Sequence, residues 1–200
     1  MSDFSLLFSF IFHPSSFILF FFTTLAAYLL GSIPSGVIVS RFFARRDVRT
    51  VGSGHTGALN TYRAAGFTPA LFAFVADGAK AIVAFQFARY LTMNDWGIAL
   101  AGIAVVIGHC YPIYTRFHGG MGLATSGVVL FSFDALMLIL IALIWFALKF
   151  VVKKSARASA IVALLLPILL FLTGSSAPYI AFGVGAGAVI FVRHVSNWNR

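Results

Sequence analysis

The chain has 200 residues, of which 60% are hydrophobic and only 10% are charged. Soluble domains usually carry about 25% charged residues, so this composition excludes a soluble globular fold and predicts an integral membrane protein. The formal net charge is +9, but no nucleic-acid recognition module accompanies it, so we expect no nucleic-acid partner. No polar linker is long enough to separate domains, so residues 1–200 are expected to form a single all-α membrane domain.

Apolar runs bounded by polar breaks mark the membrane-spanning helices, at about 20 residues for each full crossing. Residues 1–12 contain no Lys or Arg, unlike a cleaved signal peptide, and are expected to form a short extracytoplasmic leader. The run 122–132 is too short to cross alone and is expected to tilt or to be buried among its neighbours. The predicted spans, about seven with one short, are roughly 17–40, 68–90, 96–114, 122–132, 134–151, 158–174 and 177–193.

The distribution of positive charge orients the chain, because Lys and Arg concentrate in cytoplasmic loops. If the N-terminus is outside, twelve of the fourteen Lys and Arg fall inside. Seven crossings satisfy this pattern and six would break it. The prediction is an outside N-terminus and a cytoplasmic C-terminus, with the loops 52–60 and 115–120 and the tail 193–200 on the cytoplasmic side.

The first of these polar segments, 52–60, has glycine at three of its first six positions. Glycines let the backbone turn and present N–H groups to an anion, as phosphate-binding nests do. Ser53, Thr56 and Asn60 add side-chain donors, and Arg63 supplies a forked charge suited to phosphate. A plain turn between helices is the alternative, and the neighbouring clusters favour an anion site.

The segment 117–122 is also glycine-rich, and its three glycines lead directly into a predicted helix. A helix N-terminus preceded by glycines favours anion binding, while tight helix packing is the alternative. The stretch 183–188, in contrast, is expected to serve only close packing between helices. His109 and His194 lie near the inner ends of spans, where a structural hydrogen-bonding role and a functional one remain equally open.

Other chemistry-bearing residues favour simpler interpretations. Asp77 and Lys80 are three apart on one helix face within a span and are expected to neutralise each other. Cys110 is the only cysteine and is expected to be a small apolar filler. No metal-ligand set and no Ser-His-Asp arrangement is present at usable spacing. Any catalysis must therefore come from positioning and electrostatics acting on a reactive substrate, such as an activated acyl donor.

Taken together, the motifs resemble the bacterial acyl-phosphate:glycerol-3-phosphate acyltransferase family, commonly called PlsY. They follow the family's order and spacing over about 170 residues, which makes the series specific although each motif alone is weak. The matching segments are Gly31–Pro34, Val51–Arg63, Asp77–Lys80, Gly108–Pro112, Phe117–Thr125 and Arg193–Asn197.

The resemblance implies a multi-pass enzyme of the bacterial inner membrane whose site faces the cytoplasm and needs no metal or other cofactor. Its partners would be membrane lipid and two substrates, glycerol 3-phosphate and a fatty acyl phosphate, and its product lysophosphatidic acid. It implies that His194, Ser53 and Asn197 take part in catalysis. The implied phosphate-binding residues are Ser53, Gly54, Asn60, Arg63, His118, Gly119, Gly120, Thr125, Ser159, His194 and Asn197.

The chain also departs from the family pattern within the two glycine-rich segments, 52–60 and 117–122, that are expected to bind phosphate. His55 stands in place of an asparagine and Leu59 in place of a threonine, and His118 and Met121 replace two lysines. Methionine cannot neutralise a phosphate, and histidine does so only when protonated. Two alternatives to an active acyltransferase follow: a weak or inactive homologue that binds a lipid phosphate, and a small anion transporter.

Overall fold

The computed structural model describes residues 14–198, which are helical throughout with turns between and contain no strand. The leader predicted for residues 1–12 lies outside this part of the chain. The helices are α2 (Pro14–Gly31), α3 (Ser35–Ala44), α4 (Ala58–Ala65), α5 (Phe67–Thr92), α6 (Asp95–Cys110), α7 (Leu123–Phe133), α8 (Ala135–Val152), α9 (Ser155–Leu172) and α10 (Ala177–Val195), with short 3₁₀ turns η1 (Val48–Thr50) and η2 (Ile113–Thr115).

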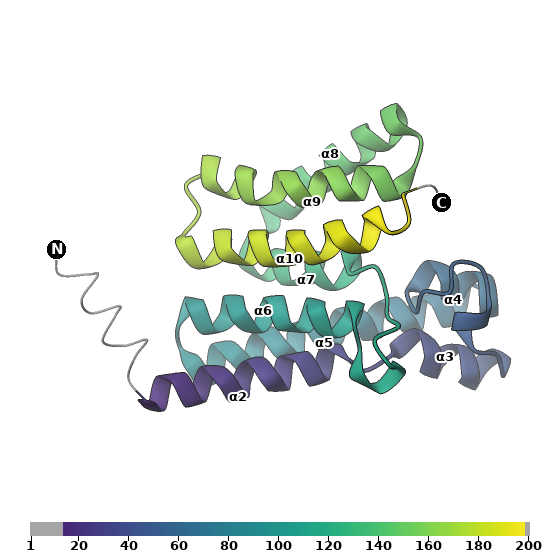
Figure 1. The fold of residues 1–200 in the computed structure, drawn as a ribbon, viewed down its shortest axis with the longest axis horizontal. Coiled ribbons are helices and arrows are strands. Elements are labelled where there is room, and N and C mark those ends of the chain that lie inside the picture. The colour runs from purple at the N-terminus through teal and green to yellow at the C-terminus, as the bar shows by residue number, and fades with distance from the viewer. Residues whose placement is uncertain (1–13, 199–200) are drawn as a thin grey trace.

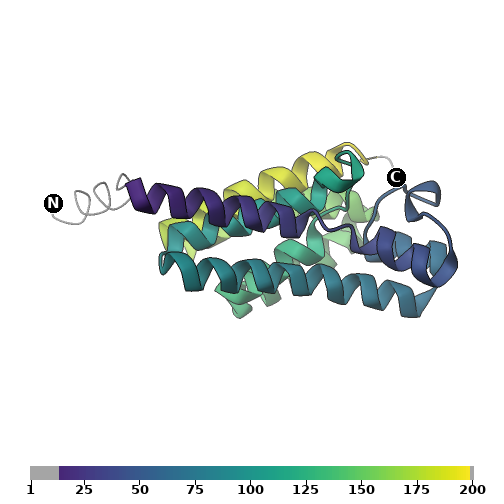
Figure 2. The same ribbon diagram turned by 90° about the horizontal axis from the view of Figure 1, so that it is seen from below.

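The long helices run side by side along the long axis of the molecule, and α6 lies between α2 and α5 on one side and α10 on the other (Figures 1 and 2). Six helical segments of the described chain are long and apolar enough to cross a membrane, the first being Ser16–Ala44. Their burial differs: 67% of the most apolar window of Asp95–Thr115 is inside the bundle, but only 6% of that of Ala135–Val152. The protein is therefore a polytopic membrane protein with α6 at its centre and α8 facing lipid.

The first predicted span, 17–40, is not one continuous helix. It breaks at residues 32–34 between α2 and α3, where Pro34 cannot donate a backbone hydrogen bond. Close packing locks this break in place, because a Cβ on Gly31 would collide with the backbone of Val105, and one on Gly108 with the carbonyl of Tyr28. The chain therefore changes direction just where it approaches the polar end of the bundle.

The predicted short element, 122–132, is confirmed as the eleven-residue helix α7. At about 1.5 Å per residue it spans roughly half of a bilayer's hydrocarbon core of about 30 Å. Residues 111–122 connect α6 to α7 through η2 and an irregular stretch, in which the glycines Gly119, Gly120 and Gly122 are buried while Arg116, Phe117 and His118 are exposed. The small residues of α10 also pack as predicted, since Gly187 lies against the carbonyl of Ala163 on α9.

Candidate active site

Three polar segments that are far apart in sequence meet at one end of the bundle, beside α3 and α4 and near the C-terminus in Figure 1. The amide of Thr56 donates to the carbonyl of Gly119 at 3.4 Å. The guanidinium of Arg193 donates to the Gly119 and Gly120 carbonyls at 2.9 and 3.1 Å. These contacts bear out the expectation that the clusters 52–60, 117–122 and 193–197 lie on one face of the molecule.

The three segments, together with residues directly before the first two, line a pocket of about 590 Å³. This volume lies within the range of small-molecule binding sites, about 300–1,000 Å³. The lining carries three guanidinium groups and one carboxylate, so the pocket suits an anion. The lining residues are Asp47, Arg49, Thr50, Ser53, Gly54, His55, Thr115, Arg116, His118, Gly119 and Arg193.

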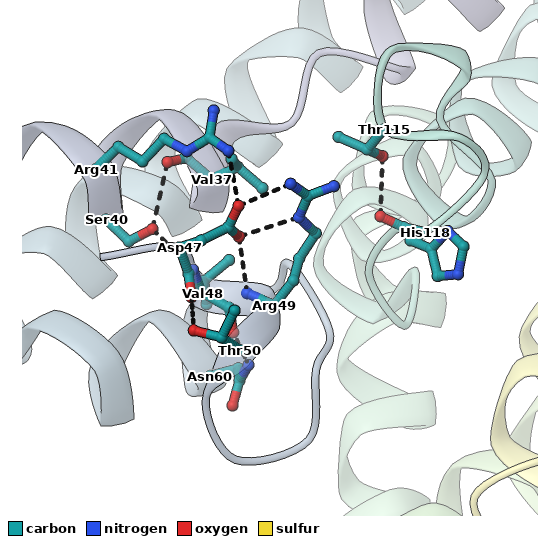
Figure 3. Close-up of polar contacts among 10 residues, drawn as sticks. All are labelled: Val37, Ser40, Arg41, Asp47, Val48, Arg49, Thr50, Asn60, Thr115 and His118. Carbon is teal, nitrogen blue, oxygen red and sulfur yellow. Dashed lines mark hydrogen bonds and ion pairs between the residues drawn. The ribbon is translucent and has the colours of Figure 1, made fainter. Parts of the chain in front are cut away.

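The first wall is organised around Asp47, which lies between the guanidinium groups of Arg41 and Arg49 (Figure 3). Each guanidinium reaches Asp47 Oδ2 at 2.7 Å, and Arg49 Nε donates to Oδ1 at 3.0 Å. These charge-assisted bonds, first of all those from Arg49, hold the pKa of the Asp47 carboxyl well below its ordinary value. The same contact raises the pKa of Arg49. Asp47 therefore stays ionised and orients Arg49 along the pocket.

Asn60 holds the backbone of residues 48–55 in place, although its side chain is buried and does not line the pocket. Its amide nitrogen lies 2.8–2.9 Å from the carbonyl oxygens of Val48, Val51 and His55. Its oxygen accepts from the Ser53 amide at 3.1 Å. A residue predicted to bind phosphate thus has an evident structural task, which is to shape the turn that brings Ser53 to the pocket.

The second wall is the irregular segment between α6 and α7. Arg116 and Phe117 both have positive φ angles, 53° and 63°, which reverse the chain. Thr115 Oγ1 donates to the His118 carbonyl at 2.9 Å, and His118 Nδ1 lies 2.7 Å from the Arg116 carbonyl. Because a carbonyl only accepts, Nδ1 carries the proton, and the other ring nitrogen, Nε2, is the one left to interact with a ligand.

Arg193 forms the third wall and was not among the predicted site residues. Its guanidinium lies over the Tyr111 ring, 5.1 Å from the ring centre, while it bonds to the Gly119 and Gly120 carbonyls. Arg49 and Arg116 also line the pocket and were likewise absent from the predicted site residues. The signal that could have identified Arg116 and Arg193 is their position directly beside the glycine and histidine motifs.

Of the predicted site residues, Ser53, Gly54, His118 and Gly119 line the pocket, and the others do not. Arg63 is exposed on α4, with its side chain against Gly52. Asn197 Nδ2 contacts His55 Nε2 at 3.4 Å and donates to the Arg193 carbonyl at 2.9 Å. Asn197 thus borders the pocket through His55.

Three further predicted residues are buried and do not line the pocket. His194 is 3% exposed, and its Nδ1 donates to the Ile190 carbonyl at 2.8 Å. Ser159 accepts a hydrogen bond from the Trp145 indole at 2.8 Å. Thr125, in the first turn of α7, is fully buried, and its hydroxyl has no hydrogen-bond partner. Binding roles for these three side chains stay predictions.

Below the pocket, Asp77 and Lys80 form the expected ion pair, with Lys80 Nζ 2.9 Å from Asp77 Oδ1. The structure adds a third member, because His109 Nδ1 lies 3.4 Å from the same oxygen. All three side chains are buried. Within residues 14–198, no group of three His, Cys, Asp or Glu side chains is arranged to hold a metal ion.

The sequence of this chain is similar to sequences of known proteins. The family described as glycerol-3-phosphate acyltransferase matches residues 21–200. The glycerol-3-phosphate acyltransferase of Nitrosospira multiformis is 38% identical over 178 residues, covering 86% of this chain and 88% of the relative. That of Rubrobacter xylanophilus is 33% identical over 173 residues, covering 86% of each.

Two solved structures are also similar, both of PlsY, an integral membrane glycerol 3-phosphate acyltransferase. Its glycerol 3-phosphate form has a TM-score of 0.79 and 31% identity, covering 94% of this chain and 92% of that one. Its lysophosphatidic acid form has a TM-score of 0.77 and 29% identity, covering 90% of each. The chain described here therefore belongs to the glycerol-3-phosphate acyltransferase family.

Proposed function

We propose that this protein transfers a fatty acyl group from an acyl phosphate to the 1-hydroxyl of sn-glycerol 3-phosphate, giving lysophosphatidic acid and inorganic phosphate. The observation that carries the proposal is the pocket, where three distant segments bring three guanidinium groups and one carboxylate around one space. Family membership supplies the reaction class. The structures of PlsY in its glycerol 3-phosphate and lysophosphatidic acid forms support the acceptor and the product.

The chemistry suits a site that works by positioning. The oxygen of the 1-hydroxyl attacks the acyl carbonyl carbon, a new ester bond forms, and the bond from that carbon to the phosphate oxygen breaks. Phosphate leaves with the electron pair. Arginines that hold both phosphates in place stabilise the charge that develops on the departing group. Because a mixed anhydride is already activated, fixing the two substrates in reacting geometry supplies much of the acceleration.

The hydroxyl proton passes to a phosphate oxygen of the donor or to a neutral imidazole. His194 is the imidazole that the family resemblance implies; it is buried and follows the pocket-lining Arg193 in the chain. In the proposed site, Ser53, Gly54, His118 and Gly119 contact phosphate directly. A flat pH–rate profile with unchanged turnover in His194→Ala would remove His194 from this scheme.

The decisive measurement uses the purified protein in lipid nanodiscs with palmitoyl phosphate and glycerol 3-phosphate, following lysophosphatidic acid by mass spectrometry. Product formation that is lost in Ser53→Ala and Arg63→Ala supports the proposal. Binding of glycerol 3-phosphate without turnover, with turnover gained in Met121→Lys, identifies a weak or inactive homologue instead. Anion uptake into vesicles without acylated product identifies a transporter.

The proposed location is the bacterial inner membrane, with the pocket facing the cytoplasm. The argument is the concentration of Lys and Arg at the pocket end, including the turn between α8 and α9 that carries Lys153 and Lys154. A membrane-impermeant maleimide tests this orientation in a Cys110→Ala background. In intact spheroplasts, cysteine placed at Gly174 should be labelled and cysteine placed at Lys153 should not; the reverse pattern contradicts the proposal.

A further inference from the structure

The buried Asp77–Lys80–His109 cluster connects parts of the molecule that no local interaction joins. Asp77 and Lys80 lie on α5, and His109 lies in the last turn of α6. Asp77 Oδ1 receives Lys80 Nζ at 2.9 Å and His109 Nδ1 at 3.4 Å. The three residues are 3%, 7% and 5% exposed, so their polar groups find partners within the protein rather than in water.

The His109 ring bears directly on the pocket wall. A Cβ at Gly120 would collide with His109 Nε2, so the ring lies flush against this glycine. The Gly120 amide also donates to the His109 carbonyl at 3.0 Å. Gly119, the pocket-lining neighbour, packs against the same carbonyl and the Pro112 ring. The orientation of one imidazole therefore limits where the Gly119–Gly120 backbone can lie.

Lys80 reaches the other irregular segment. Besides Asp77, its Nζ donates to the Ile33 carbonyl at 3.0 Å, within the break between α2 and α3. That carbonyl lies outside both helices, and its other donor is the Ser35 amide at 3.0 Å. The Asp77 carboxylate thus contacts two groups. One is the Lys80 ammonium, which donates to the carbonyl at the α2–α3 break, and the other is the His109 imidazole, which packs against Gly120.

We infer that Asp77, Lys80 and His109 form a positioning cluster that holds the Gly119–Gly120 pocket wall and the α2–α3 break in fixed relation. Neutralisation of charge alone requires only Asp77 and Lys80, and it does not explain why a third polar ring packs on a pocket glycine. Resting on the proposed function, the cluster sets the placement of the substrate phosphate at Gly119. None of its members touches substrate.

A paired substitution tests the contact between His109 and Gly120. In Gly120→Ala the new methyl group displaces the loop, and in His109→Ala the loop loses its support. A displacement of about 1 Å in a reacting geometry costs about 100-fold in kcat/KM, so each single variant should lose activity on that scale. In the double variant the methyl group fills the space left by the ring, and kcat/KM should rise about tenfold above Gly120→Ala. A double variant no better than Gly120→Ala overturns the inference.

Hydrogen–deuterium exchange provides a readout that does not depend on turnover. In His109→Ala and Asp77→Asn, the amides of Gly120 and of Thr56, which donates to Gly119, should exchange faster in the full chain in nanodiscs. Asp95→Asn changes an exposed carboxylate at the first residue of α6, at the other end of this helix from His109; it is the control and should leave these amides unchanged. Unaltered exchange in both cluster variants overturns the inference, whereas altered exchange in a protein without acyltransferase activity rejects only the proposed function.

Discussion

The two glycine-rich segments of the pocket look alike in sequence but are held in different ways. In 52–57, the backbone turns around the carboxamide of Asn60, whose partners lie five to twelve residues away. In 117–122, the carbonyls are held by Arg193, more than seventy residues away, and the backbone rests on His109 of α6. The first segment has most of its partners within its own stretch of chain, whereas the Gly119 and Gly120 carbonyls meet the Arg193 guanidinium only when α10 has packed in place.

Because of this difference, we expect substitutions in the two segments to affect stability and activity in different proportions. Short-range bonds cost little loop-closure entropy, so we expect the turn around Asn60 to form before the helices pack together. The contacts of Arg193 require α10 to pack beside α6 first. A change in the first segment should therefore alter both local folding and activity, whereas a change at Arg193 should alter activity far more than stability.

The largest effect is expected at Asn60. In Asn60→Leu, the carbonyls of Val48, Val51 and His55 lose their donor, and a buried unpaired polar group costs about 1–3 kcal/mol. We expect the free energy of unfolding to fall by about 3 kcal/mol and kcat/KM to fall by more than about 100-fold. Chemical denaturation in detergent and the acyl phosphate assay measure the two effects. Wild-type stability in this variant would contradict the role assigned to the carboxamide.

A smaller loss, confined to activity, is expected at Arg193. Arg193→Lys keeps the charge but cannot bond to the Gly119 and Gly120 carbonyls in the same forked geometry. We expect kcat/KM to fall by about 10- to 100-fold, with the denaturation midpoint close to that of the wild type. Arg193→Met, which also removes the charge, should fall further. Equal losses of stability and activity would show that this segment is held in the same manner as the first.

The sequence predicted those features that depend on neighbouring residues or on the length of an apolar run that crosses a membrane. Apolar length predicted the spans and the short α7, and residue spacing predicted the Asp77–Lys80 pair. The family motifs placed Ser53, Gly54, His118 and Gly119, and all four line the pocket. These features depend on hydropathy, helical periodicity or the order of motifs, all of which can be recognised in short stretches of the sequence.

Features set by distant packing were not predictable. The break between α2 and α3 depends on Gly31 and Gly108 fitting against facing backbones, and hydropathy across 17–40 is continuous enough to suggest one helix. The role of Arg193 depends on which carbonyls face it after α10 docks. His109 joins the Asp77 cluster only because α5 and α6 pack together. A single sequence does not indicate these pairings.

A modest effect is expected at Arg116, which is exposed at the pocket rim. It is the pocket arginine whose charge is least engaged by the described contacts, so Arg116→Gln should weaken substrate binding without disturbing either segment. We expect the KM for glycerol 3-phosphate to rise about fivefold at low salt, and by less at high salt, because exposed charges are screened. Kinetics at two ionic strengths measure this. A fall in kcat with unchanged KM would instead place Arg116 in the transition state.

The smallest effect concerns Asp47 and pH. Because its pKa in the folded protein is lowered by Arg49 and Arg41, the ionised form stabilises the fold above the unfolded pKa of about 3.9. That contribution is lost as the pH falls below this value toward the folded pKa. The melting temperature of the wild type should therefore drop more between pH 5 and pH 3 than that of Asp47→Asn. A parallel drop in both proteins would show that the ion pairs contribute nothing to stability. Since Asp47 serves only the locally held segment, its substitution should leave hydrogen exchange at Gly120 unchanged, whereas substitutions at His109 should not.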